Sequence, residues 1–459
     1  MTGPAMLGVW LAAAAAAEPV AVPVAACSDP RAAPDPRCGE ELDGRSPTPA
    51  PGATAAKAVL TGPRLAAKAA FWAPVRASEL LEVHRVLPRL EALLTSDDEL
   101  VGLRPELQYA TGFLPSAGLR FFYRRAPLPG GELVARLRSA GPSTILGETA
   151  VTTPAWLGID WRATYARRRD YLFAGIGPAS AEALAARGQG PARYGADRLV
   201  TELRWSKRFL GAVRPALHGD IGRHVYTAAG VMAGPSVADV YAADPMACAQ
   251  GAGSDGCVDP AALPGFQRGL RVAHAGGGLA LELGREGRDG SGFTFAVDAT
   301  YGQGVAGDPT RLTRLTVEGI VAAGGLDRLL LLRVRATAVE PRGGASVPFE
   351  ELVSPTGQAG MRGFPEGRFR GPSGFVGTVE YRWLVAFNLD ASLFVDVGTV
   401  AGPRFSGLAS SRVFPTIGLG LRRYATSPAH YWLAPPGDGV QLAYAPDDGL
   451  RLLVSLAAF

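Results

Sequence analysis

The stretch GTVEYRWLV, residues 377–385, alternates between polar and apolar side chains from Thr378 to Trp383. Successive side chains of an extended strand point to opposite faces, so the polar side chains lie on one face and the apolar side chains on the other. The polar positions are Thr378, Glu380 and Arg382, and the apolar positions are Val379, Tyr381, Trp383 and Val385. An acid and a base on one face fit a water-filled lumen, whereas a dry protein core excludes them. The stretch therefore predicts a membrane strand with one apolar face and one wet face.

The same alternation recurs in several other stretches of the chain. These are FTFAVDATY (293–301), RLTVEG (314–319), LRVRATA (332–338) and LDASLFVDV (389–397). Residues 101–459 provide about 16 such units if a membrane strand takes roughly 10 residues and its connection about as many again. Soluble sandwiches also alternate, but one of this length would be unusual. The sequence predicts an all-β fold, a transmembrane outer-membrane β-barrel of about 16 antiparallel strands over residues 101–459.

The residues before the barrel are expected to form three segments. The apolar run 5–17 is too short to span a bilayer and predicts a signal peptide over residues 1–17, although residues 1–4 carry no Lys or Arg. A Pro/Ala-rich composition predicts a flexible linker over residues 18–75. Leucine and valine at three- and four-residue spacings then predict a short amphipathic N-terminal helix over residues 76–96.

Four cysteines fall into two local pairs, Cys27 with Cys38 and Cys248 with Cys257. This arrangement favours two disulfides in an oxidising compartment. The alternative is acylation of Cys27, because residues 24–27 resemble a lipoprotein signal. Neither pair has a histidine at zinc spacing, so no metal is expected.

Several function classes are disfavoured by composition and motifs. A net charge of +4 without a basic run argues against nucleic acid as a partner. The five histidines are scattered along the sequence and no G-x-S-x-G motif is present, which argues against an enzyme. Residues 302–307 match G-x-G-x-x-G, but no helix is expected after them, so they predict a turn rather than a nucleotide site. No cofactor is expected.

Three stretches carry a resemblance to a known family. They are RPELQYATGFLPSAGLRFFYR (104–124), YLFAGIGPAS (171–180) and VPFEELVSPTGQAGMRGFPEGRFRG (347–371), the last followed by VEYRW and FVDVG. Together they resemble the barrel of the BamA and TamA superfamily of outer-membrane assembly factors, also called bacterial surface antigens, from about residue 104 to 459. Members usually carry POTRA modules before the barrel. No such module fits here, so the chain resembles a subgroup that lacks them.

The resemblance implies a long loop that folds back into the lumen, with an arginine-glycine-aromatic tripeptide at its tip. Arg362, Gly363 and Phe364 match that tripeptide. An arginine fork can hold two carboxylates, and Glu380 and Asp396 lie on the polar faces of consecutive strands. We expect Arg362 to bridge them as a loop anchor, while Gly363 allows close backbone approach and Phe364 wedges against the wall. The alternative is that Arg362 is a solvated loop charge.

The chain ends at Phe459, and outer-membrane barrels commonly present a terminal aromatic as an assembly signal, although strict alternation would turn Phe459 inward. The resemblance implies a protein of the bacterial outer membrane that assists insertion or translocation of other proteins. Its expected partners are outer-membrane lipids, with client outer-membrane proteins or periplasmic chaperones as further candidates. The alternative is a gated outer-membrane pore in which the inward loop is the constriction and Arg333 and Arg335 give a positive lining.

Overall fold

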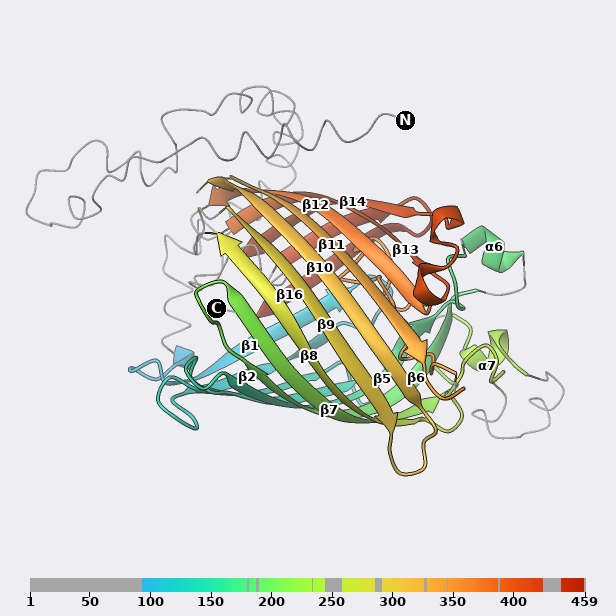
Figure 1. Ribbon diagram of the computed structural model, residues 1–459, viewed down its shortest axis with the longest axis horizontal. Coiled ribbons are helices and arrows are strands. Elements are labelled where there is room, and N and C mark those ends of the chain that lie inside the picture. Colours follow the sequence, from blue (N-terminus) through green and yellow to red (C-terminus); the bar gives the residue numbers. More distant parts are fainter. Residues whose placement is uncertain are drawn as a thin grey trace, which may run out of the picture.

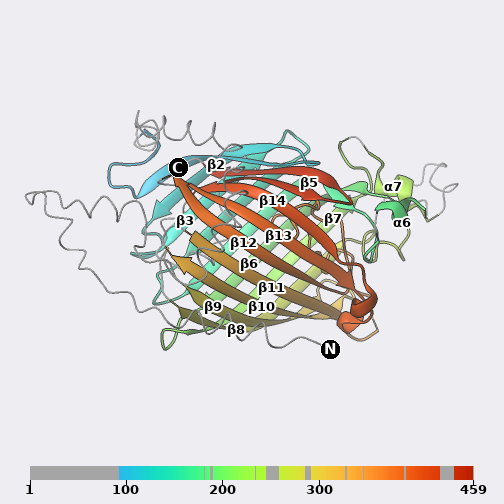
Figure 2. The ribbon, with the colours of Figure 1, turned by 90° about the horizontal axis from the view of Figure 1, so that it is seen from above.

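The computed structural model describes residues 93–179, 181–186, 190–232, 234–243, 258–284, 291–325, 328–344, 346–386, 389–423 and 439–457. These residues form a closed barrel in which every strand is antiparallel to both neighbours (Figures 1 and 2). The strands are β1 (Val101–Ala110), β2 (Ser116–Arg124), β3 (Glu132–Ser139), β4 (Ile145–Thr152), β5 (Ile159–Phe173), β6 (Ala192–Ser206), β7 (Val213–Thr227), β8 (Leu270–Gly284), β9 (Gly292–Gly304), β10 (Arg311–Gly325), β11 (Arg328–Pro341), β12 (Ser373–Ala386), β13 (Leu389–Ala401), β14 (Phe414–Arg423), β15 (Gly439–Ala445) and β16 (Gly449–Ala457). The prediction of a closed barrel of about 16 strands is confirmed.

Alternation along each strand divides the side chains between an apolar outer face and a polar lumen. On β12, Val379 is 47% exposed whereas Glu380 is 6% exposed, and on β13 Val395 is 40% exposed whereas Asp396 is fully buried. Large apolar side chains are exposed around the outer wall, among them Leu119, Leu137, Leu199, Leu203, Leu217, Ile221, Leu279, Phe295, Leu315, Leu332, Ile417 and Leu450. An apolar outer wall of this extent is what a membrane-spanning barrel requires.

The two ends of the barrel differ in their connections. The short helices α6 (Ala181–Ala185) and α7 (Val237–Val240) lie at one end, together with the 3₁₀ turns η3 (Pro403–Phe405) and η4 (Leu408–Ser410) (Figure 1). Residues 342–372, which we call the inward loop, join β11 to β12 at this same end. The G-x-G-x-x-G stretch ends β9 and turns into β10 with no helix, as predicted. Within the described residues, no helix is long and apolar enough to cross a membrane.

The barrel closes at a short seam between its first and last strands. Five positions pair across the seam, from Glu106–Ala457 to Ala110–Leu453. This is the shortest ladder between neighbouring strands in the described part of the chain, and the next shortest, β14 with β15, has six paired positions. Strands β1–β4 and β14–β16 are also shorter, at 7–10 residues, than strands β5–β13, at 13–15 residues. The wall is therefore lowest around the seam.

The expected signal peptide and linker lie outside the described residues, as does most of the expected helix over residues 76–96. Cys27, Cys38, Cys248, Cys257 and Phe459 also lie outside them. The two disulfides and the terminal assembly signal thus stay predictions.

Candidate functional site

The tip of the inward loop is held inside the barrel by Arg362. Its Nη1 donates to Glu380 Oε2 at 2.8 Å, while Nη2 donates to Asp396 Oδ1 at 2.8 Å and Nε to Asp396 Oδ2 at 3.0 Å. The backbone N–H of Arg362 also donates to Asp396 Oδ2 at 3.1 Å. The structure thus brings together the three residues paired in the sequence analysis, and it buries all of them. Arg362 is not a solvated loop charge.

The two carboxylates have further partners on the barrel wall. Thr378 donates to Asp396 Oδ1 at 2.9 Å, and Arg382 Nε donates to Glu380 Oε1 at 2.6 Å. Burial alone would lower the pKa of Arg362, but the negative charges of Asp396 and Glu380 raise it above its ordinary value. A buried charge is tolerated when it is paired and its hydrogen bonds are satisfied, and this cluster meets that condition for Asp396.

Gly363 and Phe364 fit the loop tip against the wall. A Cβ on Gly363 would lie 2.7 Å from Thr416 Cγ2 and 3.0 Å from Ala445 Cβ, so only glycine fits without a shift. Phe364 is fully buried and packs against Phe369 and Phe414, with ring centroids 5.1 and 5.9 Å apart. These contacts fix the loop tip on β14 and the end of β15.

The start of the inward loop makes a second anchor on the opposite wall, which the sequence analysis missed. Glu350 accepts a hydrogen bond from the Tyr194 hydroxyl, and Arg198 Nη2 lies 2.5 Å from Glu350 Oε2. Arg370, near the end of the loop, lies 3.6 Å from Glu350 Oε1 and donates to the carbonyl of Phe349 at 3.2 Å. Burial alone would raise the pKa of Glu350, but Arg198 and Arg370 lower it below its ordinary value.

The next residue, Glu351, binds two further strands. Arg314 Nη2 on β10 donates to Glu351 Oε2 at 2.8 Å, and His274 Nε2 on β8 lies 3.6 Å from the same oxygen. His274 Nδ1 is 2.9 Å from Asp220 Oδ1 on β7. Burial would raise the pKa of Glu351, but the contacts with His274 and Arg314 lower it to about 2. Glu351 is therefore held as a carboxylate.

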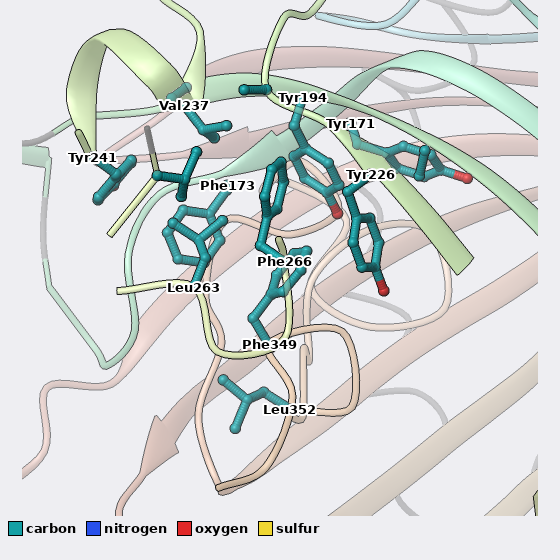
Figure 3. Close-up of a cluster of buried hydrophobic side chains, with 14 of the residues drawn as sticks. Tyr171, Phe173, Tyr194, Tyr226, Val237, Tyr241, Leu263, Phe266, Phe349 and Leu352 are labelled. Atoms are coloured by element: carbon teal, nitrogen blue, oxygen red, sulfur yellow. The ribbon is translucent and has the colours of Figure 1, made fainter. Parts of the chain in front are cut away.

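An aromatic cluster packs around Phe349 at this second anchor (Figure 3). Phe349 contacts Tyr194 and Tyr226 with ring centroids 5.5 and 5.0 Å apart, and Phe173 and Phe266 at 5.9 and 5.8 Å. These residues come from β5, β6, β7 and the segment before β8, while Phe349 comes from the inward loop. The loop thus spans the lumen between the β5–β8 wall and the β12–β15 wall.

Two other expectations change in the folded chain. His218, His224 and His274, which looked scattered in the sequence, lie on the adjacent strands β7 and β8. His218 Nε2 is 3.0 Å from Thr300 Oγ1 on β9, across Gly276 on the intervening strand. Arg333 and Arg335 both contact Glu318, at 2.5 and 3.1 Å, so one carboxylate offsets part of the positive charge that they bring to the lumen.

No family model and no curated protein matches the chain. Among solved structures, BamA from Haemophilus ducreyi lacking POTRA domains 1-3 matches with a TM-score of 0.50 and 12% identity, covering 78% of this chain and 70% of that one. The chain shares the fold of BamA. The likeness extends to fold alone at this identity.

Two CdiB structures match less well. CdiB from Acinetobacter baumannii has a TM-score of 0.44 and covers 79% of this chain, and CdiB from Escherichia coli has a TM-score of 0.47 and covers 77%. Both are 12% identical, and the chain spans 64% and 63% of their respective lengths.

Proposed function

We propose that this protein is an outer-membrane barrel that assists the insertion or translocation of other proteins by opening between β1 and β16. The observation that carries the proposal is the seam, which has only five paired positions in the described residues. The apolar outer wall supports placement in a membrane, and the shared fold with BamA is consistent with this role.

Opening the seam would expose two strand edges whose N–H and C=O groups can pair with a client strand. Backbone groups in lipid must find partners, so an open edge strongly favours strand addition. Within the described residues β16 pairs with β1 only over residues 106–110, while Thr95 and Ser96 pair with Gly102 and Val101 at the start of β1. Beyond the ladder, Thr111 N–H donates to the Leu452 carbonyl at 2.9 Å, and Leu452 N–H donates to Thr111 Oγ1 at 2.8 Å. Opening the seam therefore breaks only the hydrogen bonds of a five-position ladder and those between Thr111 and Leu452, among the described residues.

The test locks the seam with a disulfide. Tyr109 pairs with Val454 across the seam, and Tyr109→Cys with Val454→Cys would bridge it in a chain whose four native cysteines are replaced by serine. The matched control, Ala135→Cys with Thr149→Cys, bridges β3 and β4 instead. Insertion of an unfolded outer-membrane protein into liposomes is measured with each variant oxidised and reduced. The unaltered barrel should speed up this insertion relative to empty liposomes. Oxidation should abolish that increase in rate only for the seam variant. An undiminished insertion rate with the seam locked would refute the proposal.

A gated pore is the second candidate. It is favoured by a cavity of about 440 Å³ that lies between the inward loop and the barrel wall. Planar-bilayer recordings test it, because removing both anchors with Arg362→Ala and Glu350→Ala should then enlarge the conductance steps. Bilayers that stay silent with both the unaltered chain and this variant would exclude a pore.

A further inference from the structure

The cavity between the inward loop and the wall is lined by four arginines. Arg198, Arg314 and Arg335 reach it from β6, β10 and β11, and Arg370 reaches it from the loop. The same lining carries the hydroxyl groups of Thr316, Thr337, Ser354 and Thr356, together with Tyr171. Its volume of about 440 Å³ is in the range of small-molecule sites.

Cations outnumber anions around this cavity. Glu350 is shared by Arg198 and Arg370, and Glu318 is shared by Arg335 and by Arg333, which lies outside the lining. Arg314 has Glu351. The lining itself carries four arginines and two glutamates, Glu350 and Glu366. Glu366, the other acid on the lining, is exposed.

Two of the guanidinium groups retain unused donors. The Nε atoms of Arg198 and Arg370 are buried and have no hydrogen-bond partner within the described residues, and Arg370 is only 7% exposed. A buried donor without a partner costs free energy, and an excess positive charge adds to that cost. An oxyanion in the cavity would offset the excess charge, because guanidinium N–H groups on the lining can donate charge-assisted bonds to phosphate oxygens.

We propose that this cavity binds a soluble, phosphate-bearing small molecule, up to about a monosaccharide phosphate in size. The arginines recognise the phosphate, and the threonine and serine hydroxyls offer partners to the rest of the solute. The site lies in the lumen, between the wall and the inward loop, so it is reached from water rather than from the lipid around the outer wall. It is independent of whether the seam opens.

Arg333 and Arg335 provide a matched pair of variants. Both contact Glu318 Oε1 and each carries one positive charge, but only Arg335 lines the cavity. Arg335→Gln and Arg333→Gln therefore change the net charge equally and free the same carboxylate from one partner. The difference between them isolates the contribution of the cavity.

Binding is measured by calorimetry on the detergent-solubilised full chain at low ionic strength, with inorganic phosphate, glucose 6-phosphate and glucose. Both phosphates should bind saturably and glucose should not. Arg335→Gln should weaken phosphate binding by roughly tenfold, equivalent to one lost charge-assisted bond, and Arg333→Gln should leave it within about twofold. Arg370→Lys, which keeps the charge but loses the fork, should also weaken binding. Equal weakening by Arg333→Gln and Arg335→Gln, or no saturable phosphate binding by the unaltered chain, would overturn the proposal.

Discussion

The guanidinium carbon of Arg362 lies 3.3 Å from the centre of the Phe394 ring. Phe394 points into the lumen from β13, two residues before Asp396, and is 1% exposed. The ring therefore supports one face of the guanidinium while the carboxylates hold its edges. Arg362 is fixed in position as well as neutralised.

Replacing Phe394 with leucine should lower the free energy of unfolding by about 1–2 kcal/mol, because the cation–π contact is lost while most of the apolar volume remains. Urea titration of the barrel in micelles measures this change. Val395→Leu, at the neighbouring outward position, is the control and should have little effect. A Phe394→Leu barrel as stable as the control would show that the ring contact does not stabilise the anchor.

Arg362→Ala should destabilise the barrel by about 3–5 kcal/mol, because Asp396 and Glu380 would stay buried without their shared cation. Arg362→Lys should recover only part of that loss, since one ammonium cannot reproduce the fork. Arg333→Ala removes a more exposed ion pair and should cost about 1 kcal/mol or less. Unfolding midpoints measured by heat-dependent gel mobility compare the three variants. Equal midpoints for Arg362→Ala and Arg333→Ala would contradict a buried anchor.

Gly363→Ala should cost about 1–3 kcal/mol by overpacking the loop tip against Thr416 and Ala445. Gly319→Ala on β10 is the control, because a Cβ there meets nothing within 4 Å. Adding Thr416→Ala and Ala445→Gly to Gly363→Ala makes room for the new methyl group and should restore part of the lost stability. The control for the triple variant combines Gly363→Ala with a Thr→Ala and an Ala→Gly change far from the loop tip. Equal stability of the two would show that the close approach of Gly363 to Thr416 and Ala445 does not cause the destabilisation.

Contacts between residues close in the sequence could be predicted, whereas contacts between residues far apart in the sequence could not. Alternation has a period of two residues, so the inward faces of β12 and β13 could be inferred from short stretches. The pairing of Arg362 with Glu380 and Asp396 also needed the resemblance, which implies that the loop folds into the lumen. Phe394 occupies the inward face of LDASLFVDV, and an aromatic among inward acids was a signal that could have been used. Tyr194 and Glu350 are 156 residues apart, so their contact depends on barrel closure and on the path of the loop. No local pattern encodes either.

The contact network of Glu351 predicts a pH dependence. Its pKa is about 2 in the folded chain, below its ordinary value of 4.5, so its contribution to stability is complete above pH 4.5 and is lost as the pH falls toward 2. Unfolding free energies of the unaltered chain should therefore fall more steeply over this range than those of Glu351→Gln, by at most about 3 kcal/mol. Parallel pH profiles for the two proteins would show that Glu351 is not held by Arg314 and His274.

The most direct test of the central claim, that the loop tip lies against the lumen side of a closed barrel, is a disulfide between Gly363→Cys and Ala445→Cys. A Cβ at residue 363 would lie 3.0 Å from Ala445 Cβ, so an outward shift of about 0.5–1 Å gives the separation that a disulfide needs. With the native cysteines replaced by serine, mass spectrometry of the oxidised barrel should find this cross-link in most molecules. It should be nearly absent when Tyr444→Cys, on the outer face, replaces Ala445→Cys. Failure of the 363–445 pair to cross-link in the folded barrel, or equal cross-linking to residue 444, would contradict the account.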